Sequence, residues 1–125
     1  MIVAIGLDIV EVGRLERALS GHGGRFETRV YTEGERAACR GRADRLQALA
    51  ARFAAKEACM KALGTGWSRG VAFRQVEVVG ESGQPPGLNL SGEAERLASR
   101  LGVRRIHLSL THQPGVAAAV VILES

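Results

Sequence analysis

Residues 52–66 read RFAAKEACMKALGTG, and this stretch decides the fold that we expect. Upstream of it, Asp44 is a favoured N-cap residue for a helix. At its end, Gly64 suits the left-handed turn with which many helices finish. We therefore predict one long helix that begins after Asp44 and runs to Leu63.

Glu57 is unusual on this predicted helix. At ~100° per residue it falls near the middle of an apolar stripe made of Leu46, Leu49, Ala50, Phe53 and Met60. A carboxylate on that stripe should face the interior, where it requires a cation, a metal ion or hydrogen-bond donors. Lys61 follows Glu57 by four residues, in the order that favours a helical ion pair. A simple ion pair with Lys61 is one interpretation, and a metal site is another.

Only two of the 17 basic residues are lysine, and both lie in this stretch. A lysine ammonium is a compact charge whose pKa can shift, whereas the arginine guanidinium is a planar fork. Lys56 lies four residues after Arg52, on the other flank of the helix, where two cations repel unless an anion lies between them or solvent screens them. Lys56 is therefore interpreted either as a contact to a phosphate or as a chance occurrence.

Asp8 raises the same question as Glu57. It lies in the apolar run 2–10, which is rich in β-branched residues and predicts a buried strand. Asp8 either ends this strand and caps the next helix, or it meets Glu57 and the two carboxylates share a divalent cation.

The remaining pattern predicts an α+β fold in a single domain over residues 1–125. Thr32 and Glu35 form a possible capping box, and Ser91 is a possible N-cap. We expect further helices over 12–20 and 92–101, and strands over 72–79, 88–90, 106–111 and 116–123. These elements should form a small, mainly antiparallel sheet packed with one long helix and several short helices.

The composition limits the classes of function. The net charge of +4 favours an acidic partner or a phosphate-bearing ligand. Five aromatic residues are few for a surface that stacks nucleic-acid bases, and we expect no nucleic-acid partner. No apolar run approaches the ~20 residues that cross a bilayer, so we expect no membrane association. Cys39 and Cys59 are interpreted as reduced thiols in a cytoplasmic protein.

Two further segments have a simple interpretation and a functional one. Gly64, Thr65 and Gly66 form a helix C-cap, or their backbone N–H groups bind a phosphate. Ser109, Thr111 and His112 are polar residues at a strand end, or they donate hydrogen bonds to a phosphate.

Three motifs together resemble one known family. They are GLDIVEV at 6–12 followed by Arg14, RFAAKEACMKALGTG at 52–66, and SLTH at 109–112. In order and spacing they resemble holo-[acyl-carrier-protein] synthases, the small trimeric type of 4′-phosphopantetheinyl transferase. The resemblance implies an enzyme of fatty acid biosynthesis that moves 4′-phosphopantetheine from coenzyme A to a serine of apo acyl carrier protein, releasing adenosine 3′,5′-bisphosphate.

The resemblance also implies roles for individual residues. Asp8 and Glu57 match the Mg²⁺ ligands, and Lys61 matches a lysine at the pyrophosphate; these three would be the catalytic residues. Positions around coenzyme A are matched by Arg52, Gly64, Thr65, Gly66, Ser109, Thr111 and His112, and Lys56 is a further candidate there. The surface that docks the carrier protein is matched by Arg14, Arg25, Phe26 and Arg29. The active sites are expected between the subunits of a homotrimer.

Physical reasoning agrees with this assignment but leaves one choice open. Phosphoryl transfer depends mainly on charge neutralisation and positioning. Lys61 is suited to neutralise or protonate the leaving phosphate. The proton of the serine goes either to Glu57 or to a metal-bound water. The alternative function is a non-catalytic basic module that binds nucleic acid or an acidic protein.

Overall fold

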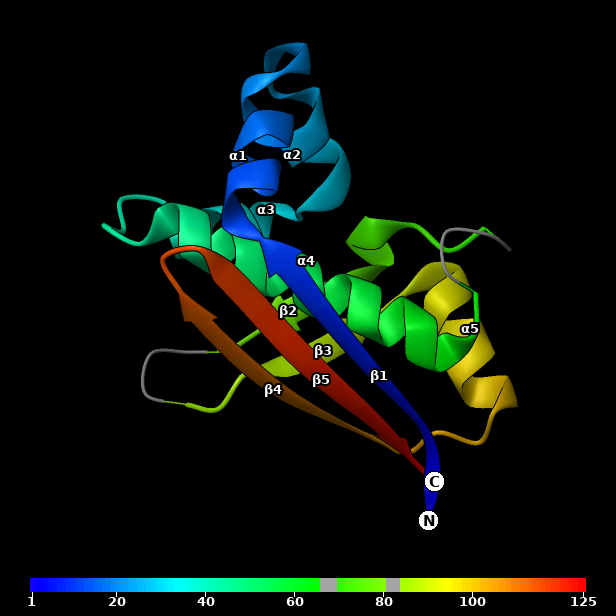
Figure 1. The fold of residues 1–125 in the computed structure, drawn as a ribbon. Coiled ribbons are helices and arrows are strands. Elements are labelled where there is room, and N and C mark those ends of the chain that lie inside the picture. The colour runs from blue at the N-terminus through cyan, green and yellow to red at the C-terminus, as the bar shows by residue number, and fades with distance from the viewer. Residues whose placement is uncertain (66–69, 81–83) are drawn as a thin grey trace.

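The structure, a computed structural model, describes residues 1–65, 70–80 and 84–125 (Figure 1). The predicted α+β fold is confirmed. Along the chain the elements are β1 (Ile2–Glu11), α1 (Val12–Ser20), the 3₁₀ turn η1 (His22–Gly24), α2 (Arg25–Val30), α3 (Glu33–Cys39), α4 (Arg45–Leu63), the 3₁₀ turn η2 (Phe73–Gln75), β2 (Val76–Val79), β3 (Gly87–Leu90), α5 (Gly92–Arg100), β4 (Arg105–Gln113) and β5 (Val116–Glu124).

The described strands form two antiparallel sheets rather than the one that we predicted. The larger sheet has the order β1-β5-β4, and the smaller one pairs β2 with β3. Figure 1 shows α4 running along one face of the larger sheet, with α1, α2 and α3 gathered at one end. The two termini lie side by side, since the backbone N–H of Ser125 donates to the carbonyl of Met1. The long helix α4 therefore contacts both sheets and the neighbouring helices.

The close packing of β1 against α4 depends on small residues. An added Cβ on Gly6 would lie 1.8 Å from the carbonyl oxygen of Ala58, so only glycine fits at this crossing. Most of the buried positions of α4 are alanines: Ala48, Ala50, Ala51, Ala54, Ala55, Ala58 and Ala62. Small side chains on both elements let the two backbones approach, and Asp8 is thereby brought against the helix two residues after Gly6.

The other face of the larger sheet is open to solvent and apolar. Ile5, Leu7 and Ile9 alternate along β1 with buried Gly6 and Asp8, and 64%, 66% and 71% of their surfaces are exposed. The prediction of a strand buried on both faces is therefore wrong for the single chain. Exposed apolar surfaces of this kind commonly mark protein interfaces.

Most of the predicted helix ends are confirmed. Thr32 and Glu35 form the capping box of α3, and Gly64 ends α4 in the left-handed conformation. Asp44 is at the N-cap of α4, but its side chain accepts hydrogen bonds from the guanidinium of Arg42 at 2.8 and 2.9 Å. The strand predicted over 72–79 begins later, at Val76, because the 3₁₀ turn η2 precedes it. Among the helices of the described residues, none combines the length and hydropathy needed to cross a bilayer.

Candidate active site

Asp8, Glu57 and Lys61 meet where β1 crosses α4. Asp8 lies on the helix-facing side of β1 and is 8% exposed. The ammonium of Lys61 donates hydrogen bonds to Asp8 Oδ1 at 2.8 Å and to the carbonyl of Leu7 at 3.1 Å. The hydrogen bond to Asp8 raises the pKa of the Lys61 ammonium. The interpretation of Asp8 as a strand end and helix cap is wrong, since β1 continues to Glu11.

Glu57 lies at the edge of the interior rather than inside it. Its side chain is half-buried, as are those of Leu46 and Phe53 on the same side of α4. The predicted apolar stripe is therefore buried in part: Leu49, Ala50 and Met60 are buried, whereas Leu46, Phe53 and Glu57 lie at the edge of the interior. Burial raises the pKa of the Glu57 carboxyl above its usual 4.5, and the negative charge of Asp8 raises it further against the opposing effect of Lys61.

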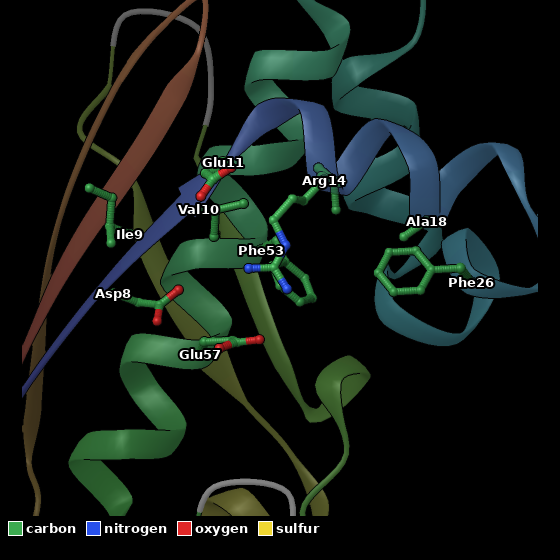
Figure 2. A pocket seen from close by; sticks show the side chains of 10 residues that line it. Asp8, Ile9, Val10, Glu11, Arg14, Ala18, Phe26, Phe53 and Glu57 are labelled. Atoms are coloured by element: carbon green, nitrogen blue, oxygen red, sulfur yellow. The ribbon is translucent and has the colours of Figure 1, made fainter.

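The two carboxylates open into a pocket of about 380 Å³ between β1, α1, α2 and α4. Figure 2 shows the side chains of Asp8 and Glu57 close together at one end of this pocket, with Arg14, Phe53 and Phe26 toward the helices α1 and α2. We call it the acidic pocket; it is lined by Asp8, Ile9, Val10, Glu11, Arg14, Leu15, Ala18, Phe26, Phe53 and Glu57. The pocket thus combines an acidic end with an apolar and basic end.

The acidic end has the donor chemistry of a magnesium site. Carboxylate oxygens are preferred Mg²⁺ ligands, and Mg²⁺ usually takes one or two carboxylates and completes its shell with water and phosphate oxygens. Within the described residues, no group of three or more His, Cys, Asp and Glu side chains forms a protein-only metal cage. A half-buried carboxylate whose pKa is raised by a neighbouring carboxylate gains from a shared cation. The chemistry of Asp8 and Glu57 therefore fits the Mg²⁺ ion that the family resemblance implies.

A second pocket, of about 620 Å³, lies on another side of α4. We call it the basic pocket; it is lined by Ala38, Arg42, Arg52, Val78, Val79, Gly80, Gln84, Pro86 and Leu110. Arg52 is held there by a hydrogen bond from Nη1 to the carbonyl of Ala48 at 3.3 Å. Among the described residues, the buried Nε of Arg52 is the side-chain polar atom that lacks a hydrogen-bond partner. An unpaired buried donor on a cation is suited to an anionic ligand.

Lys56 does not line either pocket. Its side chain is fully buried, and its ammonium bonds to Glu35 Oε1 at 2.7 Å and to the carbonyls of Val76 and Phe73 at 2.7 and 3.0 Å. The structure therefore corrects the expectation that Lys56 contacts coenzyme A. An ammonium with three buried acceptors has no donor left for a phosphate. Its anionic partner is a carboxylate of the protein itself.

The turn after α4 is a helix C-cap. The backbone N–H groups of Gly64 and Thr65 donate to the carbonyls of Lys61 and Met60, at 3.0 and 3.2 Å. These two groups are therefore engaged within the helix end, and their contact with coenzyme A stays a prediction. The prediction for Gly66 lies outside the described residues.

The strand-end residues lie away from Asp8 and Glu57. Ser109 and Thr111 are exposed on the open face of the larger sheet, opposite α4. His112 lies on the other side of β4, with Nε2 at 3.7 Å from Asp44 Oδ2. A single chain therefore does not bring these predicted ligand contacts to the acidic pocket.

Two of the four predicted carrier-docking residues line the acidic pocket, and the other two lie on α2. Arg14 and Phe26 line it, and Arg25 and Arg29 are exposed on α2 beside Phe26. The ring of Phe26 packs against Phe53 with centroids 5.9 Å apart. The surface is thus basic with an apolar centre.

Comparison with known proteins decides the family. The family model of the 4′-phosphopantetheinyl transferase superfamily matches residues 4–121. The chain belongs to this superfamily. It is 53% identical to a holo-[acyl-carrier-protein] synthase of Methylobacterium radiotolerans, over 100% of this chain and 95% of that protein.

Solved phosphopantetheinyl transferases share its fold. A crystal structure of holo-[acyl-carrier-protein] synthase from Neisseria meningitidis superposes with a TM-score of 0.88, at 32% identity, over 100% of both chains. A synthase from Bacillus anthracis in complex with coenzyme A (3′,5′-ADP) has a TM-score of 0.81 and 38% identity, and the match covers 100% of this chain and 98% of that one. The chain is therefore a transferase.

The sequence did not point to Arg42 as a site residue or to the pairing of Glu35 with Lys56. Arg42 enters the basic pocket from the loop before α4, and nothing local distinguishes it from the other arginines. Glu35 was recognised as half of a capping box, but its ion pair with Lys56 is a tertiary contact across 21 positions of the chain. No local sequence pattern marks a buried lysine, so the pairing of Glu35 with Lys56 could not be predicted.

Proposed function

We propose that this chain transfers 4′-phosphopantetheine from coenzyme A to a serine hydroxyl of an apo acyl carrier protein. The observation that carries the proposal is the meeting of Asp8 and Glu57 at one end of the acidic pocket, with the ammonium of Lys61 bonded to Asp8. Membership in the transferase superfamily supports the same reaction class. We further infer that the reaction serves fatty acid biosynthesis in the cytoplasm, a setting that suits the buried, unpaired thiols of Cys39 and Cys59.

The residues of the acidic pocket divide the chemistry between them. The serine oxygen attacks the phosphorus that carries the pantetheine arm, and the bond from this phosphorus to adenosine 3′,5′-bisphosphate breaks. Glu57 accepts the serine proton directly or through a water. Lys61 donates to the leaving phosphate and balances its new charge. Asp8 and Glu57 would hold Mg²⁺, which would supply neutralisation of the pyrophosphate charge.

Arg52 and Arg42 are assigned to the phosphates of coenzyme A. The basic pocket presents two guanidinium groups, and the Nε of Arg52 is buried and unpaired among the described residues. Arginine forks match phosphate oxygens in geometry and charge. The exposed residues Ser109 and Thr111 and the half-exposed His112 are proposed to add hydrogen bonds to the same ligand.

Arg14, Arg25, Phe26 and Arg29 are proposed to dock the carrier protein. Arg14 and Phe26 line the acidic pocket, and Arg25 and Arg29 are exposed on α2, the helix that carries Phe26. Acidic carrier surfaces would be attracted by the charges and anchored on the ring.

We infer that the active enzyme is a homotrimer with sites shared between chains. The exposed row of Ile5, Leu7 and Ile9 offers an apolar surface for a second copy. The proposed ligand contacts are also divided, because Ser109 and Thr111 lie on the face of the sheet opposite Asp8 and Glu57. A neighbouring chain packed on the open face would bring both sets to one ligand.

Sedimentation analysis tests the assembly. The wild-type chain is expected to sediment as a trimer, and Leu7→Glu as a monomer. Leu101→Glu, which introduces the same charge at an exposed leucine at the end of α5, should stay trimeric. A monomeric wild-type chain would contradict the shared site.

Mass spectrometry tests the transfer. The chain is incubated with coenzyme A, Mg²⁺ and an apo carrier protein, and the carrier is expected to gain one phosphopantetheine. An unmodified carrier, together with tight binding of DNA, RNA or an acidic protein by the chain, would favour the non-catalytic binding module instead.

A further inference from the structure

The Glu35–Lys56 ion pair is sealed inside the protein, and all its polar atoms are satisfied. Both side chains are 0% exposed, and the Lys56 ammonium lies 2.7 Å from Glu35 Oε1. The same oxygen accepts from the backbone N–H of Thr32 at 2.9 Å, and Oε2 accepts from that of Val78 at 2.8 Å. Lys56 uses its other two donors on backbone carbonyls of Phe73 and Val76.

These bonds join the walls of both pockets. Glu35 ties α3 to β2 at Val78, and both α3 and β2 contribute to the basic pocket through Ala38, Val78 and Val79. Lys56 ties α4 to η2 at Phe73, whose ring stacks on Phe53 of the acidic pocket with centroids 5.4 Å apart.

Stability alone is a weak reason for such a pair. Removing two charges from water is expensive, and well-packed apolar residues in place of a buried ion pair are often as stable or more so. Burial lowers the pKa of the Lys56 ammonium, and the charge of Glu35 opposes that effect. The hydrogen bonds of the pair are directional, unlike an apolar contact. Each bond fixes a backbone group at a defined place relative to α4.

We propose that Glu35 and Lys56 are positioning residues for the coenzyme A site. They hold β2 and η2 against α4. The pocket walls around Arg52, four residues before Lys56, and around Glu57, one residue after it, are thereby kept in place. The inference rests on the proposed function, because coenzyme A is the ligand whose binding it concerns.

Calorimetry and kinetics with three variants test this role. Lys56→Met and Glu35→Gln each leave one buried charge without its partner, whereas the double variant Glu35→Gln/Lys56→Met leaves none. All are measured at a temperature where circular dichroism shows them folded. We expect the Kd and the KM for coenzyme A to rise roughly ten- to hundredfold in each, since small misplacements of binding groups have effects of that size. The KM for the carrier protein should change less than about twofold, because the docking residues lie on α1 and α2.

Leu97→Ala is the matched control. It removes buried packing in α5, away from both pockets, and should lower the melting temperature without changing the Kd for coenzyme A. If the single variants do not fold, the double variant carries the test, because it buries no unpaired charge.

The outcomes separate the two proposals. A folded double variant that binds coenzyme A like wild type overturns the positioning role and leaves the transferase function standing. Equal losses in the double variant and in Leu97→Ala would show a general effect of destabilisation and also overturn it. A wild-type chain that fails to bind coenzyme A would overturn the proposed function and this inference with it.

Discussion

The acidic pocket and the basic pocket are built on the same helix but differ in what their charges require. α4 supplies Glu57 to the first and Arg52 to the second. Their separation of five positions corresponds to a rotation of ~140° around the helix, so the two side chains point in different directions. Beside the acidic pocket, the charge of Asp8 meets that of Lys61. In the basic pocket, Arg42 is paired with Asp44, but the buried Nε of Arg52 is unpaired among the described residues. We therefore propose the first pocket for the reaction and the second for holding an anion.

The largest effect is expected from removing the charge of Glu57. Glu57→Gln should reduce the turnover of carrier protein by roughly 10²–10⁴-fold, as for the loss of a group that moves a proton. The melting temperature should not fall, because burial already disfavours the charged form of Glu57. Turnover is measured by mass spectrometry and stability by thermal melts. Glu95→Gln, at an exposed position of α5, is the control. Near-normal turnover of the Glu57 variant would remove Glu57 from the mechanism.

A smaller, different effect is expected in the basic pocket. Arg52→Met should raise the KM for coenzyme A about tenfold or more, because a charge-assisted bond to a phosphate is lost. The turnover at saturating coenzyme A should change much less than in the Glu57 variant. Arg104→Met, which removes an exposed charge elsewhere, serves as the matched control for net charge. If both variants changed the KM equally, the effect would be long-range and the pocket assignment wrong.

Mixing the two impaired variants sharpens the comparison. If one site takes Glu57 from one chain and Arg52 from its neighbour, mixed trimers of Glu57→Gln and Arg52→Met chains contain some intact sites. Random assortment leaves about a quarter of the sites intact. At coenzyme A concentrations well below the KM, activity after subunit exchange should therefore exceed that of either variant alone. No recovery, with exchange confirmed by native mass spectrometry, would place both residues in the same chain's site.

The smallest effect is a pH dependence of stability in the acidic pocket. The pKa of Glu57 is raised in the folded state, so the folded chain binds its proton more tightly than the unfolded chain does. This contribution to stability is present below pH 4.5 and is lost as the pH rises through the folded pKa. Without divalent cations, wild type should therefore lose stability relative to Glu57→Gln as the pH rises from about 4 to 7. Parallel curves for the two proteins would contradict the raised pKa.

The features that were predicted well from the sequence depend on local chemistry. The Thr32–Glu35 capping box and the left-handed Gly64 are determined by residues within a turn of each other. The meeting of Asp8 and Glu57 was also predictable, because each is a carboxylate in an apolar context and such groups need a shared partner.

The features that were missed depend on which side of a helix or strand packs against the rest of the protein. Hydrophobicity predicted one buried stripe that includes Glu57, but β1 packs on α4 at Ala58, and Phe53 and Glu57 are left at the edge of the interior. Lys56 was predicted to contact a phosphate because its buried partner Glu35 comes from another element. The run 2–10 shows no alternation in sequence, so its open face could not be distinguished from a buried one.

The unequal burial of the two lysines has a practical consequence for labelling. Of the two lysines, Lys61 is half-exposed to an amine-reactive reagent, whereas Lys56 is shielded. The hydrogen bond to Asp8 raises the pKa of Lys61, so labelling of this amine requires alkaline pH. A dye ester under these conditions would attach to Lys61 alone among the lysines. The wild-type sequence thus provides a single position for a fluorescent reporter at the rim of the acidic pocket.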